Sequence, residues 1–397
     1  MTRALWVTAE PPDRDLGGGS IREAYLLEAL AQEVETHLLL AGTLEDQRTR
    51  SVLAGVTEVD IATRPLPRGR GGRRIDDLRR VLLDHEPADV IENRPRVRDL
   101  AGRLPALGSF DLVCVEHDRL APLIAARAGS GGRWVLTMQN LPSERKADEL
   151  SLARSRRQRW LYRRELGDAR RFEAQMVGAY DRVVVPSKRD VAALGGRAVL
   201  IPNGVDTARF RPSPLTASRT VVFTGTLSWW PNVEGLTWFC DAVLPLVRAS
   251  VSDARFDIVG REPLPEVRAL GERPGVAVHG DVASVVPWLE QARLAVVPLH
   301  IGSGTRLKAL EAMASSRPVA GTSVGLEGLE IEGGVQALVA DDPAALAAAV
   351  VQLLTDDAFA NRIAAAGADH ARERFAWDAI GRRFVDTLLD LTQRQAR

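Results

Sequence analysis

One loop, residues 300–311 (HIGSGTRLKALE), combines glycines, two cations and a carboxylate at the start of a predicted helix. Gly302 and Gly304 let backbone N–H groups approach an anion closely, and the helix N-terminus adds partial positive charge. Arg306 and Lys308 fall in the first helical turn, where the helix dipole disfavours cations unless an anion binds there. These residues predict a diphosphate-binding loop. The alternative is an ordinary glycine-containing turn with solvated charges.

A carboxylate lies beside this predicted phosphate site, because Glu311 follows Lys308 by three residues and shares its helix face. The dinucleotide-binding fingerprint fails, since Leu307 stands where its third glycine belongs. The chain also has no G-x-x-x-x-G-K-[ST] motif, which argues against a P-loop kinase or ATPase. A second glycine run, Gly17–Ser20, follows the first predicted strand in the position of another anion-facing loop. A flexible connector explains that run equally well.

Rigid elements must position these loops, and short apolar runs alternate with helical patterns along the whole chain. The predicted strands are Ala4–Ala9, Val34–Leu40, Ala88–Ile91, Leu112–Val115, Trp134–Met138, Arg182–Pro186, Thr220–Thr224, Phe256–Val259, Val276–His279, Ala295–Pro298, Pro318–Gly321 and Ala337–Val339. The predicted helices include Ser20–Gln32, Asn232–Arg248, Val282–Gln291, Arg306–Ser315, Pro343–Leu354, Asp357–Arg374 and Trp377–Arg394. Apolar strands between helices are typical of parallel strands buried on both faces. We therefore expect two doubly wound, Rossmann-like α/β domains.

The boundary between these domains is visible in the sequence. Residues 201–218 carry three prolines and an Asn-Gly pair without a helical or strand period, which predicts a linker. We expect a first domain over residues 1–201, a linker over 202–218, a second domain over 219–374 and a C-terminal helix over 375–397. Two such domains imply a cleft between them, the usual place for a ligand.

The composition is that of an ordinary globular chain. Its 397 residues suffice for two domains, 52 Lys+Arg balance 52 Asp+Glu, and 45% of residues are hydrophobic. These values argue against a disordered chain and give no reason to expect nucleic acid as a partner. Cys114 and Cys240 make neither a metal spacing nor a disulfide framework. The N-terminus lacks the pattern of a signal peptide, and the longest apolar stretch, near residues 344–354, is too short to span a bilayer, so a cytoplasmic protein is expected.

The order of these segments resembles the GT-B fold glycosyltransferases, and the second half is similar to their large retaining family 4. In that half, the resemblance rests on TGTLSWWPNVEG (224–235), FDIVGREP (256–263), VAVHGDVASVVPWLEQARLAVVP (276–298) and GSGTRLKALEAMASSRPVAGT (302–322). In the first half it rests on the GGGS loop, VLTMQN (135–140) and IPNGVDTARF (201–210). The stretch RERFAWDAIGRRF (372–384) resembles the family's last helix, which crosses back to the first domain. The resemblance implies transfer of a sugar from a nucleoside-diphosphate donor to an acceptor hydroxyl, with retention of anomeric configuration.

Some site residues follow from this resemblance, and others depart from it. Glu311 matches the second of two glutamates in the family, and its implied role is to accept hydrogen bonds from the donor ribose. Ser303 stands where the first glutamate is expected, a departure shared by a subgroup with the pattern GSGTRLKxLEAM. Relatives often carry an Arg and a Lys after the first strand of the second domain, and this chain has neither there, so Arg306 and Lys308 are assigned to the departing diphosphate. Gln139 replaces a histidine common among relatives, and it forms hydrogen bonds but cannot exchange a proton.

The two predicted strands that end at residues 260–261 and 280–282 resemble family strands whose loops contact the nucleobase through backbone. A plain strand–helix turn is the alternative. The residues assigned to catalysis are Arg306, Lys308, Gln139 and His300. Those assigned to donor binding are Gly17, Gly18, Gly225, Arg261, Val282, Gly302, Ser303, Gly304, Thr305 and Glu311. We expect no metal or other cofactor, since no Asp-x-Asp cluster ends a strand of the second domain.

Histidines and tryptophans near the strand ends allow two interpretations each. His117 and His300 follow predicted strands, and each is weighed as a substrate contact against a structural role. Trp229, Trp230 and Trp238 are interpreted as core or domain-interface packing in preference to a platform for a sugar.

Two Arg-rich segments, residues 64–80 and 153–171, lie in the predicted first domain, the second around Trp160. A peripheral contact with a membrane surface or an anionic acceptor is one interpretation, and a solvated Arg-rich helix is the other.

The sequence thus predicts a retaining glycosyltransferase of bacterial glycoconjugate or natural-product biosynthesis. A small-molecule, glycan or lipid-linked acceptor is expected. Two alternatives remain, namely a sugar-nucleotide epimerase or hydrolase on the same fold and a non-catalytic nucleotide-sugar-binding subunit. The nucleobase, the sugar, the acceptor and the oligomeric state stay open.

Overall fold

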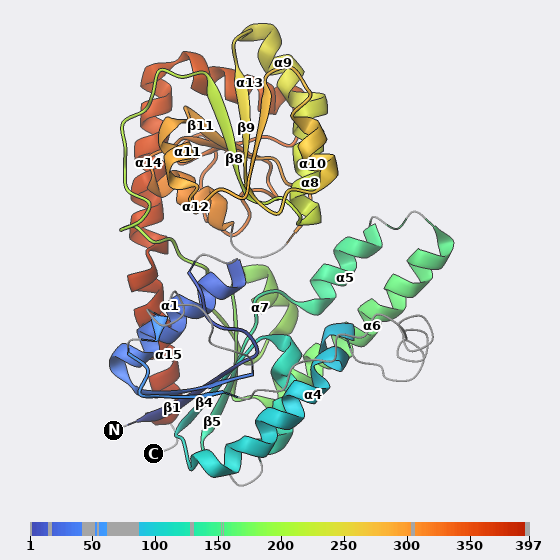
Figure 1. Cartoon of the computed structure of the whole chain (residues 1–397), viewed down its shortest axis with the longest axis vertical. Coiled ribbons are helices and arrows are strands. Elements are labelled where there is room, and N and C mark those ends of the chain that lie inside the picture. The colour runs from blue at the N-terminus through green and yellow to red at the C-terminus, as the bar shows by residue number, and fades with distance from the viewer. Residues whose placement is uncertain are drawn as a thin grey trace. The chain divides into compact units, whose positions relative to one another are not determined.

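The computed structural model describes residues 2–14, 18–41, 52–53, 55–61, 87–127, 131–151, 153, 155–302 and 306–393. The chain divides into two compact units (Figure 1): unit 1 comprises Met1–Pro202 and Gly381–Arg397, and unit 2 comprises Asn203–Ile380. The C-terminal helix α15 (Trp377–Gln393) begins in unit 2 and ends in unit 1. Val205 and Phe210, from the segment predicted as a linker, are buried in the core of unit 2, so this segment packs as part of that unit.

Unit 1 is built on a parallel seven-stranded sheet in the order β3-β2-β1-β4-β5-β6-β7. Its strands are β1 (Arg3–Thr8), β2 (Glu35–Leu40), β3 (Glu58–Ile61), β4 (Leu112–Glu116), β5 (Arg133–Thr137), β6 (Arg182–Val185) and β7 (Ala198–Leu200). Its described helices are α1 (Gly18–Glu33), α4 (Ala88–Arg103), α5 (Pro142–Ser151), α6 (Arg156–Ala179) and α7 (Lys188–Leu194), with 3₁₀ segments η1 (Leu104–Leu107) and η2 (Asp118–Arg127). The strand order reverses between β1 and β4, and the carboxyl ends of strands at such a switch point are where doubly wound sheets bind ligands.

Unit 2 repeats this design with a parallel six-stranded sheet in the order β10-β9-β8-β11-β12-β13, and its switch point lies between β8 and β11. The strands are β8 (Thr220–Thr226), β9 (Arg255–Arg261), β10 (Val276–Gly280), β11 (Leu294–Val297), β12 (Val319–Gly321) and β13 (Leu338–Val339). The helices are α8 (Trp230–Trp238), α9 (Leu244–Ser250), α10 (Pro265–Leu270), α11 (Val286–Gln291), α12 (Leu307–Ala314), α13 (Pro343–Thr355) and α14 (Asp357–Phe375), with a π-helical turn η3 (Phe239–Val243) between α8 and α9. Figure 1 shows α8, α9 and α10 on one side of the sheet and α12 and α14 on the other.

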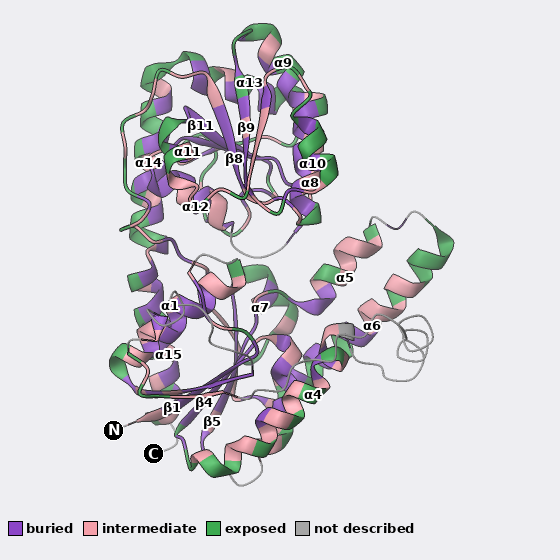
Figure 2. Ribbon diagram, viewed as in Figure 1, coloured by how far each residue is buried: buried purple, intermediate pink, exposed green. Residues whose placement is uncertain are grey.

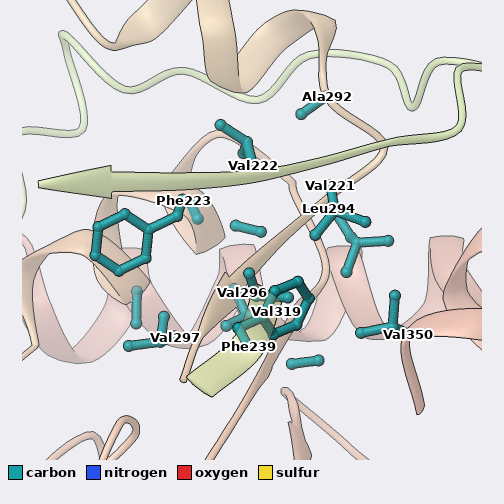
Figure 3. Packing of buried hydrophobic residues seen from close by; sticks show 14 of the residues in the cluster. Val221, Val222, Phe223, Phe239, Ala292, Leu294, Val296, Val297, Val319 and Val350 are labelled. Carbon is teal, nitrogen blue, oxygen red and sulfur yellow. The ribbon is translucent and has the colours of Figure 1, made fainter. Parts of the chain in front are cut away.

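The central strands of both sheets are apolar along their length because helices cover both of their faces. Figure 2 shows them as buried, and β4 is buried at every position. In unit 2, Val221, Phe223 and Val296 belong to one core cluster with Phe239 of η3 (Figure 3). Each such side chain stabilises the fold by about 1.5–3 kcal/mol through its removal from water. The loops at the strand ends therefore rest on a rigid base.

The predicted strands match observed strands to within one or two residues at each end, with one exception. Ala88–Ile91 was expected to be a strand and forms the first turn of α4, so this prediction is wrong. Val90 and Leu100 are buried and Val97 packs against the same core, a spacing that fits one face of a helix. A short apolar run cannot by itself distinguish the two structures. The edge strands β3 and β7 were not predicted, and both are only partly buried.

Candidate functional site

The predicted phosphate loop lies at the switch point of unit 2, between β11 and α12. At this edge of the sheet Gly225, in β8, approaches two polar side chains. A Cβ added at Gly225 would lie 3.3 Å from Nζ of Lys308 and 3.1 Å from Nδ2 of Asn232. Residues of β8, α8 and α12, which are far apart in the sequence, therefore meet around one ammonium group, and Gly225 leaves the space that this group occupies.

Lys308 supplies that ammonium group. Its Nζ donates a hydrogen bond of 2.5 Å to Oδ1 of Asn232, and it lies 4.3 Å from the ring centroid of Phe223 and 5.9 Å from that of Trp229. Burial, together with the positive charge of Arg306, lowers the pKa of Lys308 to about 7. A bound anion favours the charged form of a lysine. Lys308 is therefore suited to hold a phosphate group.

Glu311 lies one helical turn after Lys308 in α12. Burial raises the pKa of Glu311 to about 7, although the charges of Arg209 and Lys308 favour its ionised form. The carboxyl group thus exchanges a proton near neutral pH, and when ionised it can accept hydrogen bonds from hydroxyl groups. Its contact with a ribose stays a prediction.

Arg306 lies directly before α12, and only 4% of its side chain is exposed. Its Nε donates to the carbonyl oxygen of Val324 at 3.0 Å, and its Nη2 donates to that of Gly302 at 2.9 Å. Nη2 also lies 3.8 Å from Oε2 of Glu327. Through these hydrogen bonds Arg306 links Gly302, before α12, to Val324, in the segment after β12. Its contact with phosphate stays a prediction.

Gly302 fits its position because it has no side chain. Its φ is +124°, in the region that favours glycine. A Cβ there would lie 3.1 Å from Nη1 of Arg306 and 3.3 Å from the ring of Trp229. The loop backbone can therefore pass close to both side chains.

The tryptophans around α8 differ in their burial. The exposed fraction is 42% for Trp229 and 36% for Trp230, so these two are not core residues, while packing at a domain interface stays a prediction. They begin α8 at the edge of the sheet, where their rings reach solvent. Trp238, at the other end of α8, packs against the core of unit 2.

Hydrogen bonds from backbone N–H groups connect the ends of β8, β9 and β10. The N–H of Leu227 donates to the carbonyl oxygen of Arg261 at 2.7 Å, and the N–H of Glu262 donates to Oδ1 of Asp281 at 2.8 Å. Glu262 and Asp281 have φ values of +53° and +57°, which cost energy in non-glycine residues. Val282 follows and packs against the core. The nucleobase contacts of Arg261 and Val282 stay predictions.

The two strand-end histidines have local partners. Nδ1 of His300 lies 3.3 Å from Oε2 of Glu234, and its ring meets that of Trp238 edge-on, with centroids 4.3 Å apart. Both partners belong to α8, so the ring is held against this helix. His117, with a φ of +79°, is hydrogen-bonded through Nδ1 to the carboxylate of Asp118. A catalytic role for His300 stays a prediction.

In unit 1, Gln139 follows β5 beside the switch point. Its Nε2 donates to Oε1 of Glu116 at 3.0 Å, and a Cβ added at Gly19 would lie 1.9 Å from its Oε1. Gly18 begins α1 and is exposed. The structure thus brings Gln139 to the N-terminus of α1, while its contact with the sugar and the donor contact of Gly18 stay predictions.

Buried charges surround this position, and the sequence analysis missed them. Burial raises the pKa of both Glu23 and Glu116, and the charge of Glu116 further disfavours ionisation of Glu23. Burial lowers the pKa of Arg22 to about 10 against the charge of Glu116. Nε1 of Trp6 donates to Oε1 of Glu23 at 3.1 Å. A glutamate at the end of the otherwise apolar strand β4 was the signal that could have revealed this cluster.

Several predicted site residues, Gly17, Ser303, Gly304 and Thr305, lie outside the described residues, as does the Arg-rich segment 64–80. Within the described ranges, no group of three or more His, Cys, Asp or Glu side chains is arranged to hold a metal ion.

Residues 156–171 of the second Arg-rich segment form the outer part of α6, which pairs with α5 in a hairpin that extends from the sheet of unit 1 (Figure 1). The exposed fraction of Trp160 is 59%. Arg156, Arg157, Arg159 and Arg163 surround it and are exposed, and none forms an ion pair with an acidic side chain in the part of the chain that the structure describes. No single described helix is long and apolar enough to cross a bilayer. The helices α13 and α14 reach the required length and apolar composition only together, and they are bent by 103° where they meet.

The chain is similar to known proteins in sequence. Residues 218–356 match the family "Glycosyl transferases group 1". A phosphatidyl-myo-inositol mannosyltransferase of Mycobacterium leprae is 30% identical over 227 residues, which cover 54% of this chain and 59% of the relative. A GDP-mannose-dependent alpha-(1-6)-phosphatidylinositol monomannoside mannosyltransferase of Mycobacterium tuberculosis is 28% identical over 362 residues, covering 81% of this chain and 88% of the relative.

The fold is also similar to that of solved structures. A sucrose-phosphate synthase from Thermosynechococcus elongatus superposes with a TM-score of 0.73 at 18% identity, covering 99% of this chain and 100% of the other. The chain therefore has the GT-B architecture of two Rossmann-like domains.

Proposed function

Because residues 218–356 form a domain of the glycosyl transferases group 1 family within a GT-B fold, we propose that this protein is a glycosyltransferase. It moves a sugar from a nucleoside-diphosphate donor to an acceptor hydroxyl, with retention of anomeric configuration. The observation that carries this proposal is Lys308, whose ammonium group lies at the switch point of unit 2 beside Gly225. Anionic ligands bind doubly wound sheets at this place.

In this reaction the bond between the anomeric carbon and the diphosphate oxygen breaks, and the acceptor oxygen bonds to that carbon. Negative charge grows on the departing diphosphate, which takes up the proton that the acceptor hydroxyl loses. Lys308 stabilises that charge, together with N–H groups of the loop before α12. A positioned donor of this kind contributes about a hundredfold or more to the rate. Glu311 orients the nucleoside by accepting hydrogen bonds, and Arg306 holds the loop in place. Contact of Gln139, in unit 1, with the sugar stays a prediction of the sequence.

The transfer needs no metal ion under this proposal, because Lys308 supplies the positive charge that a divalent cation would otherwise provide at the diphosphate. Turnover is expected to persist in excess EDTA. Loss of turnover in EDTA and recovery with added magnesium would contradict this part.

The names of the relatives suggest the first substrates to test: GDP-mannose as donor and an inositol-containing lipid as acceptor. The experiment is a screen of UDP-, GDP- and TDP-sugars with the purified full chain. It measures nucleotide release and product formation with and without acceptor, and NMR assigns the anomeric configuration of the product. Sugar release that is independent of acceptor indicates a hydrolase, and a changed nucleotide-sugar indicates an epimerase. Binding without turnover indicates a non-catalytic subunit.

The outer end of α6 fits a peripheral contact with an anionic lipid surface. Exposed arginines without acidic partners bind anionic headgroups, and an exposed tryptophan inserts at the membrane–water interface. We expect the chain to co-sediment with vesicles containing phosphatidylglycerol and less with vesicles of phosphatidylcholine alone. The double variant Arg156→Gln/Arg157→Gln should weaken this binding. Arg382→Gln/Arg383→Gln, the same charge change at exposed positions of α15, is the control and should not.

A further inference from the structure

Asn232 has no role assigned by any motif, yet it is the hydrogen-bond partner of Lys308. Only 1% of Asn232 is exposed. Its Nδ2 donates to the carbonyl oxygen of Thr226 at 2.6 Å, and its Oδ1 accepts from Nζ of Lys308. The first bond fixes which end of the amide faces the lysine. Asn232 therefore presents an acceptor, and never a donor, to the ammonium group.

The partner is a neutral amide, and this has an electrostatic consequence. A carboxylate at this place would neutralise Lys308 and leave no net charge for a ligand. An amide oxygen orients the ammonium group through its partial charge only, so the full positive charge remains available. The aromatic rings of Phe223 and Trp229 add orientation without adding a formal charge.

We propose that Asn232 is a positioning residue, which holds Lys308 toward the diphosphate without adding a negative charge of its own. This inference rests on the proposed function and names the residue that orients the lysine of its phosphate site. The charged groups that face Lys308 are Arg306 and Glu311 from its own side of the site, and the facing elements β8 and α8 contribute Gly225 and Asn232, which carry no charge.

A second consequence is that binding of the diphosphate and protonation of Lys308 are coupled. Without ligand, burial and Arg306 keep the pKa of Lys308 near 7. A diphosphate favours the ammonium form and raises this pKa, so binding draws a proton onto the lysine above neutral pH. The affinity of the wild-type chain for a nucleoside diphosphate should therefore fall as the pH rises from 7 to about 9, by up to tenfold per pH unit.

The test compares Asn232→Asp with Asn232→Ala by measuring the dissociation constant of UDP and GDP between pH 6.5 and 9. The Asp variant should bind about tenfold or more weakly at pH 7, the scale of one charged hydrogen bond, because Lys308 now pairs internally. Its pH dependence should be flat, since the new carboxylate raises the pKa of Lys308 beyond the range. The Ala variant should also bind weakly but keep the wild-type pH dependence, because its partner position is still uncharged.

Asn361→Asp is the matched control, since Asn361 is exposed in α14 and donates to the carbonyl oxygen of Asp357. It should bind as wild type does. Should the Asp variant fail to fold, calorimetry of the wild-type chain still decides. At pH 8, in buffers of different ionisation enthalpy, UDP or GDP binding should take up protons in the wild type, and this uptake should be absent in Lys308→Gln.

Wild-type affinity and pH dependence in Asn232→Asp would overturn the inference, and so would identical pH profiles in the Asp and Ala variants. Neither result contradicts the proposed function if the wild-type chain transfers sugar from the donor to an acceptor. A wild-type chain that binds no nucleoside diphosphate and transfers no sugar refutes the proposed function itself.

Discussion

The carboxyl ends of the two sheets differ in how their buried charges are compensated. In unit 2, Lys308 is held by the neutral amide of Asn232. In unit 1, Arg22 is buried and interacts with the charges of Glu116 and Asp190, so positive and negative charges compensate each other within the protein. One sheet end is thus prepared for an anion from outside. The other offers hydrogen-bonding groups suited to uncharged hydroxyls.

This difference arises on the same scaffold. Both sheets are parallel, both reverse their strand order once, and both have a polar residue at the switch point. The fold decides where a ligand can bind, and the side chains at that place decide which ligand it is. Removing the charge in one unit should therefore abolish a function that the other unit cannot replace.

The largest expected effect follows from Lys308→Gln. Loss of the ammonium group should lower kcat by about a hundredfold to a thousandfold, because the departing diphosphate loses a positioned charge. The same variant should bind nucleoside diphosphates more weakly. Lys188→Gln, an exposed lysine at the start of α7 in unit 1, serves as control and should leave both values unchanged. Steady-state kinetics with unchanged kcat in folded Lys308→Gln would contradict the assignment.

A smaller effect, on stability, is expected for Arg306→Ala. Two backbone carbonyls would lose a buried charged donor, which costs about 2–3 kcal/mol and lowers the Tm by about 4–12 °C for a domain of this size. Arg306→Lys should not restore the Tm, since a single ammonium group does not reproduce the fork of a guanidinium. Thermal unfolding measures both. An unchanged Tm with lost nucleotide binding would instead support direct contact of Arg306 with phosphate.

The carboxyl cluster of unit 1 predicts a modest, pH-dependent effect for Glu23→Gln. Because burial raises the pKa of Glu23, the native state binds more protons than the unfolded state, and stability falls as pH rises through the range between the two pKa values. Glutamine does not ionise, so it removes this loss of stability, and its side-chain oxygen can still accept the hydrogen bond from Nε1 of Trp6. The Tm should rise at pH 8 by about 2–4 °C, the equivalent of about 1 kcal/mol, and less at pH 5. Glu373→Gln, at an exposed position of α14, should change neither value.

The sequence predicted the glycine–cation loop and the alternating parallel architecture because both depend on local patterns. Lys308 and Glu311 could be placed on one helix face from their spacing alone. Asn232 could not be recognised, since its pairing with Lys308 exists only because β8 and β11 are neighbours in the sheet. The helix at Ala88 was missed because the short apolar run at its start does not by itself distinguish a strand from a helix.

The partners of Arg306 were equally inaccessible. The sequence shows a cation in the first turn of a helix, but not that the Val324 carbonyl, after β12, faces its guanidinium. Buried charges such as Glu23 look like an ordinary helix surface in sequence. Tertiary packing buries Glu23, and only the positions of Trp6 and Glu116 around it in the fold reveal this environment.

The smallest effect is expected for Gly19→Ala, which should change turnover through unit 1 without changing nucleotide binding by unit 2. An added Cβ would lie 1.9 Å from Oε1 of Gln139, so the flexible amide must move while the fold persists. If Gln139 contacts the sugar, kcat should fall by about tenfold, the scale of one hydrogen bond, with nucleotide affinity unchanged. Gly167→Ala is the matched control, because a Cβ added at this position of α6 would meet nothing within 4 Å, and this variant should retain full activity. The double variant Gly19→Ala/Gln139→Ala should be no slower than Gln139→Ala alone, because the methyl group then has no amide to displace. A double variant with additive losses would mean that Gly19 acts independently of Gln139, through the N-terminus of α1 itself.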